Sequence, residues 1–233
     1  MSVAVIIAAS GSGQRLGGDM PKQFQLLGDK PVLAHSVQAF DRLDIINEII
    51  IAAPAEYVAH TWDITARYRF SKVRKVVPGG PSRAESIYAA FKQLSTDTGA
   101  VLIHDGVRPF VSEKIIMSVI QATDTHSAAV AGIPLTDTIK EINPACQVLQ
   151  TPDRHRFWQV QTPQGFTYNV IKKAYEQGKA DDILASVTDD SMLVERLGIA
   201  VQMVEGHPGN IKITTREDLL MSEIMLRSKS QTV

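Results

Sequence analysis

Short apolar runs rich in β-branched residues recur along the first half of the chain, and each is followed by a segment with helical spacing. The runs are Val3 to Ala8, Glu48 to Ala53, Val73 to Val77 and Ala100 to His104. Intervening segments such as Pro31 to Leu43, Arg83 to Leu94 and Ser112 to Thr123 repeat apolar residues at steps of three and four. Strands that alternate with helices in this way form a parallel sheet covered on both faces. The sequence therefore predicts a three-layer α/β fold with a mainly parallel sheet.

The pattern changes after the apolar run that ends at Ile133. Polar and apolar residues alternate over Thr138 to Ile142 and over Gln147 to Gln150, with Asn143-Pro144-Ala145 between them. Two alternating stretches joined by a short segment that contains turn-forming Asn and Pro predict a β-hairpin. A hairpin this short holds no core of its own, so we expect an arm at residues 133–152 that projects from a single domain spanning residues 1–233. Beyond it, helical spacing or strand character returns over Asn169 to Glu176, Asp189 to Leu197, Ala200 to Val204 and from about Thr215.

Composition excludes several classes of protein. The 24 Lys and Arg residues balance 25 Asp and Glu residues, so the chain lacks the basic excess of a dedicated nucleic-acid binder. The single Cys146 forms no internal disulfide, and no Cys/His group has zinc-site spacing. No basic region precedes the apolar N-terminal run, and no stretch approaches the roughly 20 apolar residues of a membrane helix. We expect a cytoplasmic protein with neither nucleic-acid nor membrane partners.

A loop rich in small residues follows the first predicted strand. It reads Ala8-Ala9-Ser10-Gly11-Ser12-Gly13-Gln14-Arg15-Leu16-Gly17, and Pro21-Lys22-Gln23 follows shortly after. Small residues there let backbone N–H groups approach phosphate oxygens, and Arg15 and Lys22 add two positive charges. The loop therefore indicates a triphosphate site, with a simple tight turn as the structural alternative. A P-loop is excluded because no Gly-Lys-Ser/Thr occurs, whereas a dinucleotide-binding fold stays an alternative, with Glu56 as its late acidic residue.

Further motifs, taken in order, resemble one enzyme family. They are Gly79-Gly80 with Arg83 and Ser86, His104-Asp105-Gly106-Val107-Arg108-Pro109, Asp137-Thr138, Arg154 with Thr162-Pro163-Gln164, Thr188-Asp189, and Asn210-Ile211-Lys212. With the loop after the first strand, this series spans nearly the whole chain and resembles the 2-C-methyl-D-erythritol 4-phosphate cytidylyltransferases. The resemblance implies a Rossmann-like nucleotidyltransferase domain that transfers the cytidylyl group of CTP to 2-C-methyl-D-erythritol 4-phosphate in non-mevalonate isoprenoid synthesis.

The resemblance also implies roles for individual residues. The residues expected to stabilise charge during catalysis are Arg15, Lys22, Arg154 and Lys212. The expected nucleotide contacts are Ala8, Ala9, Ser10, Gly11, Gly80, Ser86, Asp105 and Gly106. The expected substrate contacts are Asp105, Arg108, Thr138, Arg154, Thr188 and Lys212. Ser10 and Pro81 stand where the family often has an alanine and an acidic residue, which leaves individual contacts open.

His104 closes the predicted strand that begins at Ala100, and Asp105 follows it at the carboxyl end. Ligands of open α/β sheets bind at the carboxyl ends of strands, and a carboxylate there can hold Mg²⁺ against phosphate oxygens. A turn or helix-capping aspartate is the structural alternative. The attacking group is a phosphate monoester with a second pKa of about 6, so no general base is needed. We therefore expect a structural role for His104.

The predicted arm corresponds to a segment that, in the family, crosses to a second subunit. The resemblance thus implies a homodimer in which Thr138 and Arg154 reach the neighbour's site. Ribitol-5-phosphate cytidylyltransferase is the nearest alternative, disfavoured by Thr188-Asp189. A sugar-1-phosphate nucleotidyltransferase using UTP or dTTP and a non-catalytic nucleotide-binding protein are further alternatives.

Overall fold

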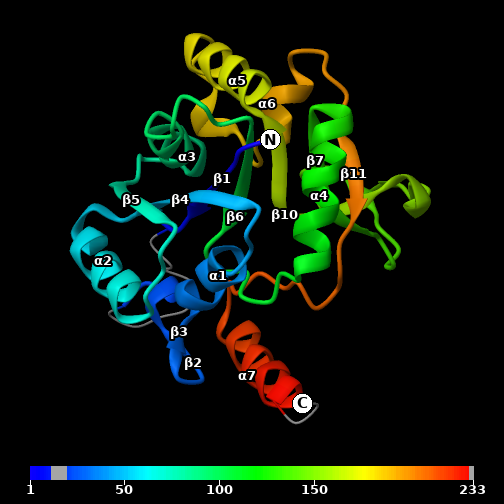
Figure 1. Cartoon of the computed structure of the whole chain (residues 1–233). Helices are drawn as coiled ribbons and strands as arrows, with labels where there is room; N and C mark the ends of the chain where they lie inside the picture. The colour runs from blue at the N-terminus through cyan, green and yellow to red at the C-terminus, as the bar shows by residue number, and fades with distance from the viewer. Residues whose placement is uncertain (12–19, 231–233) are drawn as a thin grey trace.

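The computed structural model describes residues 1–11 and 20–230. Among these residues, seven strands form one sheet in the order β11-β7-β10-β6-β1-β4-β5 (Figure 1). Their bounds are β1 Val3–Ala8, β4 Ile46–Ala53, β5 Val73–Pro78, β6 Ala100–Asp105, β7 Ala128–Pro134, β10 Trp158–Thr167 and β11 Gln202–Glu205. Only β10 runs antiparallel to its neighbours in this sheet, so the predicted mainly parallel sheet is confirmed.

Helices cover both faces of the sheet. On one face lie α1 Val32–Asp41, α2 Val58–Arg67 and α4 Glu113–His126, and on the other lie α3 Arg83–Phe91, α5 Tyr168–Ala180 and α6 Ser191–Glu195. Strand β1 divides its side chains accordingly, because Val5 and Ile7 join the first cluster and Ala4 and Ile6 join the second. All four side chains are fully buried. The three-layer architecture follows from a central strand that is apolar on both faces.

Strand β10 was not anticipated from the sequence. Thr162-Pro163 lies at its centre, and a proline is rarely found within a central strand because it has no N–H to donate. The pairing of β10 with β7 shifts register between Val160 and Gln164, which accommodates that proline as an irregularity. On the C-terminal side of the shift, β10 pairs with β6 from Gln164 to Thr167.

The last helix, α7 Arg216–Ser230, belongs to neither of the two helical layers that cover the sheet. It packs near a small hairpin formed by β2 Leu26–Leu27 and β3 Lys30–Pro31. A third apolar cluster centred on Leu27, Val107 and Ile213 joins these elements to the body. None of the described helices has the length and apolar character needed to cross a membrane.

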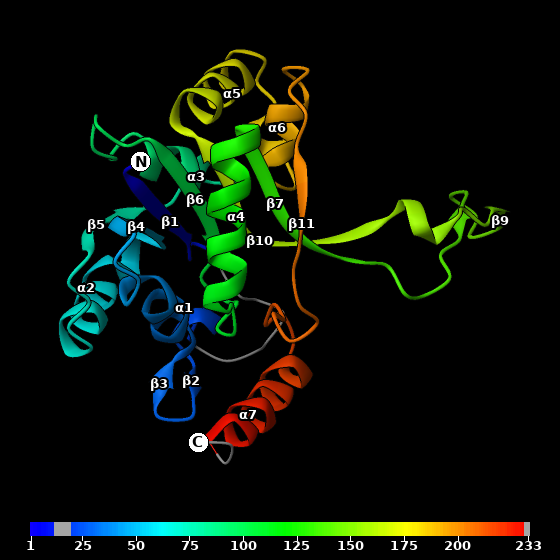
Figure 2. The same ribbon diagram turned by 45° about the vertical axis from the view of Figure 1, so that its right-hand side comes forward.

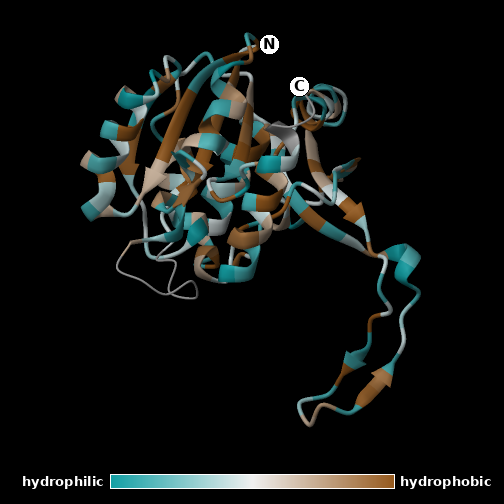
Figure 3. Cartoon of the chain, turned by 90° about the horizontal axis from the view of Figure 1, so that it is seen from below, coloured by the Kyte–Doolittle hydropathy of each residue, from teal (hydrophilic) through white to brown (hydrophobic). Residues whose placement is uncertain are grey.

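The arm projects from the sheet as predicted (Figures 2 and 3). It leaves the sheet after β7 and returns at the start of β10, where Trp158 pairs with Pro134, so it covers residues 135–157 instead of the predicted 133–152. Its own two strands, β8 Glu141–Ile142 and β9 Val148–Gln150, are shorter than the alternating pattern predicted. Within the described chain several of its apolar side chains are exposed, including Ile142 at 52%, Val148 at 58% and Leu149 at 60%.

Candidate active site

A cavity of about 370 Å³ opens at the carboxyl ends of β1 and β6. The parallel register of these strands sets Ala8 beside Asp105, although the two residues are far apart in the sequence. Its lining contains many of the residues predicted for nucleotide binding, together with their neighbours: Ala8, Ala9, Ser10, Gly11, Lys22, Gln23, Gly80, Pro81, Ser82, Arg83, Asp105, Val107 and Lys212. The cavity therefore lies where open α/β sheets bind ligands.

Backbone and amide hydrogen bonds hold the described part of the small-residue loop. The N–H of Ala9 donates to Ala52 O at 2.8 Å, while Gln23 Nε2 donates to Ala9 O at 2.6 Å and Gly11 O at 3.0 Å. Lys22 precedes Gln23 in a short 3₁₀ turn and lines the cavity. The predicted phosphate contact Arg15 lies outside the described residues.

Another part of the cavity wall is formed where β5 leads into α3, next to Ser10. Ser86 Oγ accepts hydrogen bonds from Ser10 Oγ at 2.7 Å and from the Gly80 N–H at 3.0 Å. A Cβ at Gly79 would come within 2.3 Å of Ser10 Cβ, so this approach requires glycine. Ser10, which departs from the family pattern, thus becomes part of the wall.

Asp105 is surrounded by three cations. Its Oδ1 lies 3.3 Å from Arg83 Nε, and its Oδ2 lies 3.3 Å from Arg108 Nε and 2.9 Å from Lys212 Nζ. Burial raises the pKa of the Asp105 carboxyl, but the charges of Arg83, Lys212 and Arg108 outweigh it and hold this pKa far below its usual range. Asp105 is therefore ionised throughout the physiological pH range.

A second cavity, of about 270 Å³, adjoins the first. Both cavities are lined by Arg83, Asp105 and Lys212. Two predicted substrate contacts, Arg108 and Thr188, line only the second. The cluster around Asp105 therefore forms the boundary between two compartments, an arrangement that suits the transfer of a charged group from one bound molecule to another.

Four of the predicted site residues that the structure describes line neither cavity. Ser86, an expected nucleotide contact, is fully buried behind Ser10 and Gly80, to which it is hydrogen-bonded. Gly106 lines neither cavity, because it lies behind Ala8 and donates its N–H to Ala8 O at 2.9 Å. Thr138 and Arg154 are exposed on the arm, where Arg154 Nη1 donates to Thr136 O at 2.8 Å. Within one chain, the arm extends away from the seven-stranded sheet (Figure 2).

His104 is fully buried beneath this cluster. Its Nε2 lies 3.1 Å from Arg108 O, and its Nδ1 lies 2.9 Å from Thr162 Oγ1. Because a carbonyl only accepts, Nε2 carries the proton and Nδ1 accepts from the threonine hydroxyl. Burial lowers the pKa of His104 to about 4, the nearby charge of Asp105 opposing the shift and those of Arg108 and Arg83 adding to it. A neutral histidine fixed on both sides fits the expected structural role.

Acidification is expected to destabilise the fold through His104. Its folded pKa of about 4 lies below the unfolded value of 6.5. Between these two pH values, His104 is therefore protonated in the unfolded chain but largely neutral in the folded one. The free energy of unfolding should fall as the pH drops from 6.5 towards 4, by at most about 3 kcal/mol from this group. Urea unfolding over this pH range should give a shallower dependence for His104→Gln than for the wild type. Equal slopes would contradict this role of His104.

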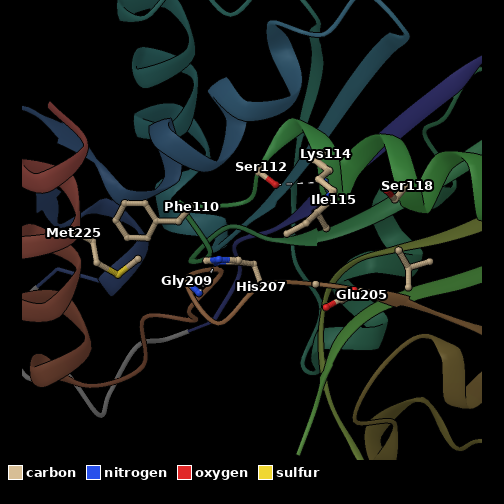
Figure 4. Close-up of a pocket in the computed structure, with 11 residues that line it drawn as sticks. Phe110, Ser112, Lys114, Ile115, Ser118, Glu205, His207, Gly209 and Met225 are labelled. Atoms are coloured by element: carbon tan, nitrogen blue, oxygen red, sulfur yellow. Dashed lines mark hydrogen bonds between the residues drawn. The ribbon is translucent and has the colours of Figure 1, made fainter. Parts of the chain in front are cut away.

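A larger cavity, of about 530 Å³, lies between α4, the end of β11 and α7 (Figure 4). Its lining includes Phe110, Ser112, Lys114, Glu205 and His207, and none of the predicted site residues. Lys114 and Glu205 carry opposite charges, so this cavity lacks the cluster of cations that a triphosphate requires. Its volume alone does not make it the candidate active site.

Arg83 belongs to the sequence motif that begins at Gly79-Gly80, but the motif alone predicts no role for it. In the structure it begins α3 and contacts both Asp105 and Asp190. The Ser82–Glu85 capping box and the preceding Gly79-Gly80 are the sequence signals that place Arg83 at a helix start beside the nucleotide loop. Asp190 carries no comparable local signal, because its partners come from distant parts of the chain.

Comparisons with known proteins agree with this geometry. A family model described as 2-C-methyl-D-erythritol 4-phosphate cytidylyltransferase matches residues 3–228. Curated proteins of that name from Halalkalibacterium halodurans and Alkaliphilus oremlandii are 42% and 40% identical to this chain, covering 99% and 98% of it and 100% and 96% of their own lengths.

Solved structures give the same result. The 4-diphosphocytidyl-2C-methyl-D-erythritol synthase of Anaerococcus prevotii matches with a TM-score of 0.86 and 33% identity, covering 97% of this chain and 98% of its own. The 2-C-methyl-D-erythritol 4-phosphate cytidylyltransferase of Francisella tularensis matches with a TM-score of 0.81 and 27% identity, covering 96% and 99%. Because the family model and these relatives match almost the whole chain, it belongs to the 2-C-methyl-D-erythritol 4-phosphate cytidylyltransferase family.

Proposed function

We propose that this protein transfers the cytidylyl group of CTP to 2-C-methyl-D-erythritol 4-phosphate, giving 4-diphosphocytidyl-2-C-methyl-D-erythritol and pyrophosphate in isoprenoid precursor synthesis. The observation that carries the proposal is the pair of adjoining cavities that share Arg83, Asp105 and Lys212. Two anionic molecules can meet at this cluster. Family membership supports CTP and the branched polyol phosphate as those molecules.

In this proposal CTP lies in the cavity beside β1. The small residues from Ala8 to Gly11 permit close approach of the nucleotide, and Gly80 lines the same cavity. Ser86, which is fully buried, holds this wall in place through its hydrogen bonds with Ser10 and Gly80. Lys22 lies in the same lining and supplies positive charge for the triphosphate, with Arg15 as its expected partner. The polyol phosphate then occupies the cavity that Arg108 and Thr188 line.

The reaction needs positioning and charge stabilisation more than proton transfer. A phosphate oxygen of the substrate attacks the α-phosphorus of CTP, a new P–O bond forms, and the bond to pyrophosphate breaks. The attacking phosphate is already largely ionised because its second pKa is about 6. Lys22 faces the charge that grows in the transition state, whereas Lys212 and Arg108 orient the attacking phosphate. His104, buried and neutral, takes no part as a base.

We propose that Asp105 also contributes to binding Mg²⁺. The described residues include no group of three or more His, Cys, Asp or Glu side chains that could hold a metal by themselves. A single ionised carboxylate nevertheless fits Mg²⁺, which is commonly bound by one or two carboxylates while substrate phosphates complete its ligands. When bound, the ion would screen the phosphate charge. Asp105, with its strongly lowered pKa, is present as the carboxylate that this role needs.

Removal of divalent cations is expected to lower turnover by more than about tenfold, because phosphate charge near Asp105 would lose its counter-ion. Asp105→Asn should lower the rate and reduce its dependence on added Mg²⁺. Pyrophosphate release measured across a Mg²⁺ titration tests both effects. A rate that is indifferent to a chelator would remove the metal from the proposal.

We further propose that the protein is a homodimer joined through the arm. The exposed Ile142, Val148 and Leu149 give the arm an apolar surface, which supports burial against a second subunit. In that assembly, Thr138 and Arg154 would reach the partner's site. We also propose a cytoplasmic location, which the free thiol of Cys146 supports because it suits a reducing compartment.

A panel of nucleotides and acceptors tests the proposed function. CTP with 2-C-methyl-D-erythritol 4-phosphate should release pyrophosphate faster than UTP or ATP with the same acceptor. Ribitol 5-phosphate has a longer main chain and no methyl branch, so site polar groups would be left unpaired. Each unpaired group should lower kcat/KM by about 10- to 100-fold. Thr188→Ala should reduce this preference, whereas equal use of both acceptors would overturn the assigned substrate.

A further inference from the structure

A second buried carboxylate lies behind the cluster around Asp105. Asp190, at the start of α6, is 0% exposed and lines neither of the two cavities. Its Oδ2 accepts a hydrogen bond from Arg83 Nη1 at 2.7 Å, and its Oδ1 accepts one from the hydroxyl of Tyr175. Asp190 therefore touches no molecule bound in those cavities, and any effect it has on turnover passes through its neighbours.

Arg83 joins the two carboxylates. Its Nη1 contacts Asp190, and its Nε lies 3.3 Å from Asp105 Oδ1. Because the guanidinium is planar and its donors keep a fixed geometry, these contacts on two of its nitrogens define its orientation. Burial lowers the pKa of Arg83, but the charges of Asp190 and Asp105 outweigh it and raise this pKa above its ordinary value. Arg83 is a permanent cation held between two anions.

The negative charge of Asp190 affects which of the neighbouring cations pair with Asp105. Asp105 faces Arg83, Arg108 and Lys212, so one carboxylate has three cations to satisfy. Asp190 supplies a second negative charge for Arg83, which leaves Asp105 Oδ2 to Arg108 and Lys212. Without that charge, Arg83 would turn its free nitrogens towards Asp105 and compete with Lys212 for Oδ2, because bidentate pairing is favourable for arginine and carboxylate.

Asp190 is itself fixed to the sheet. Gln164 Oε1 on β10 accepts hydrogen bonds from the N–H groups of Asp190 at 3.0 Å and Ser191 at 3.2 Å. Gln164 pairs with Ile103 of β6, two residues before Asp105. The segment that carries Asp190 is therefore attached to the strand that carries Asp105, which limits relative movement between the two carboxylates.

We propose that Asp190 is a positioning residue for cytidylyl transfer, holding Arg83 in the orientation that leaves Asp105 paired with Arg108 and Lys212. The inference rests on the proposed function, because it assigns Arg108 and Lys212 to the substrate phosphate. Tyr175 supports Asp190 from the opposite side as a neutral donor; burial raises the pKa of its hydroxyl well above the ordinary value.

Asp190→Asn provides the main test. The amide keeps the shape of the side chain and removes its charge, so kcat should fall by about 10- to 100-fold, as expected when reacting groups are slightly misplaced. The KM values for both substrates should change much less, because the lining of the cavities is retained. Tyr175→Phe should give a smaller loss in the same direction.

A matched control is another buried carboxylate at the far end of a strand. Glu48, near the start of β4, is 7% exposed, and its Oε1 accepts hydrogen bonds from Ser95 N and Thr98 Oγ1. Glu48→Gln should lower stability and leave kcat of the folded enzyme unchanged. If Asp190 were merely structural, Asp190→Asn would behave like this control, and that result would overturn the inference.

A double variant tests whether Asp190 acts through Arg83. If it does, Arg83→Met combined with Asp190→Asn should lower kcat no further than the more damaging single substitution. Independent, multiplying losses would contradict the inference.

A crystal structure of Asp190→Asn gives a readout that does not depend on turnover. Arg83 is expected to turn towards Asp105 and Lys212 to leave Oδ2, whereas an unchanged Asp105–Lys212 pair would overturn the inference. A wild-type protein that released no pyrophosphate from CTP would instead overturn the proposed function, so the two failures are distinguishable.

Discussion

Replacing Lys22 with alanine is expected to lower kcat with CTP by about 10²- to 10³-fold, because a preorganised charge at the developing anion is worth several kcal/mol. Lys22 lines the first cavity together with Gly80. A contact that strengthens in the transition state affects kcat more than KM. Steady-state kinetics with both substrates, on protein whose thermal unfolding matches the wild type, measure the effect.

Lys30→Ala is a suitable control for this substitution. Lys30 lies close in sequence, on β3, and its Nζ donates to Gln38 Oε1. It lines neither of the two cavities at the candidate site. Its loss should leave kcat unchanged within experimental error. Near-wild-type turnover in folded Lys22→Ala would remove Lys22 from the proposed catalytic group.

Mixing two inactive variants is expected to restore activity if the arm completes the partner's site. Arg154→Ala removes a residue of the arm, and Lys22→Ala removes a residue of the body. In a mixed dimer, one site then receives an intact arm and an intact body. Random exchange of equal amounts should restore about a quarter of the wild-type sites, because half of the dimers are mixed and each has one intact site. Pyrophosphate release before and after subunit exchange measures this recovery.

The matched control mixes Lys22→Ala with Lys212→Ala. Both residues line the same cavity of one chain, so no combination of these subunits yields an intact site. This mixture should stay inactive. If the Arg154→Ala mixture also stays inactive despite demonstrated exchange, each site is built from a single chain and the proposed arm crossing is wrong.

Local patterns in the sequence predicted the layers and the edge of the sheet that holds the site. The apolar runs of β1 and β6 indicated strands, and parallel strands bring their carboxyl ends to one edge, which explains why Ala8 and Asp105 meet. The chain's short motifs then indicated the family. Each of these predictions depends on residues adjacent in sequence or on a regular period.

Features that depend on distant partners were not predicted. The direction of β10 depends on its pairing with β6 and β7, and Thr162-Pro163 weakened its strand pattern. The pair formed by Arg83 and Asp190 joins residues 107 positions apart. No periodicity indicates such a contact, because it exists only once α3 and α6 lie on the same face of the sheet.

The parallel register that brings Ala8 to Asp105, with Lys212 added from near the C-terminus, makes activity a reporter of complete folding. Contacts between segments so far apart in the sequence raise the contact order, and a high contact order slows folding because loop-closure entropy must be overcome before these contacts form. A partly folded chain that has assembled only its first half lacks Lys212 and therefore the boundary between the two cavities. During refolding, catalytic turnover should thus recover only with the last long-range contacts, after helical structure has already returned.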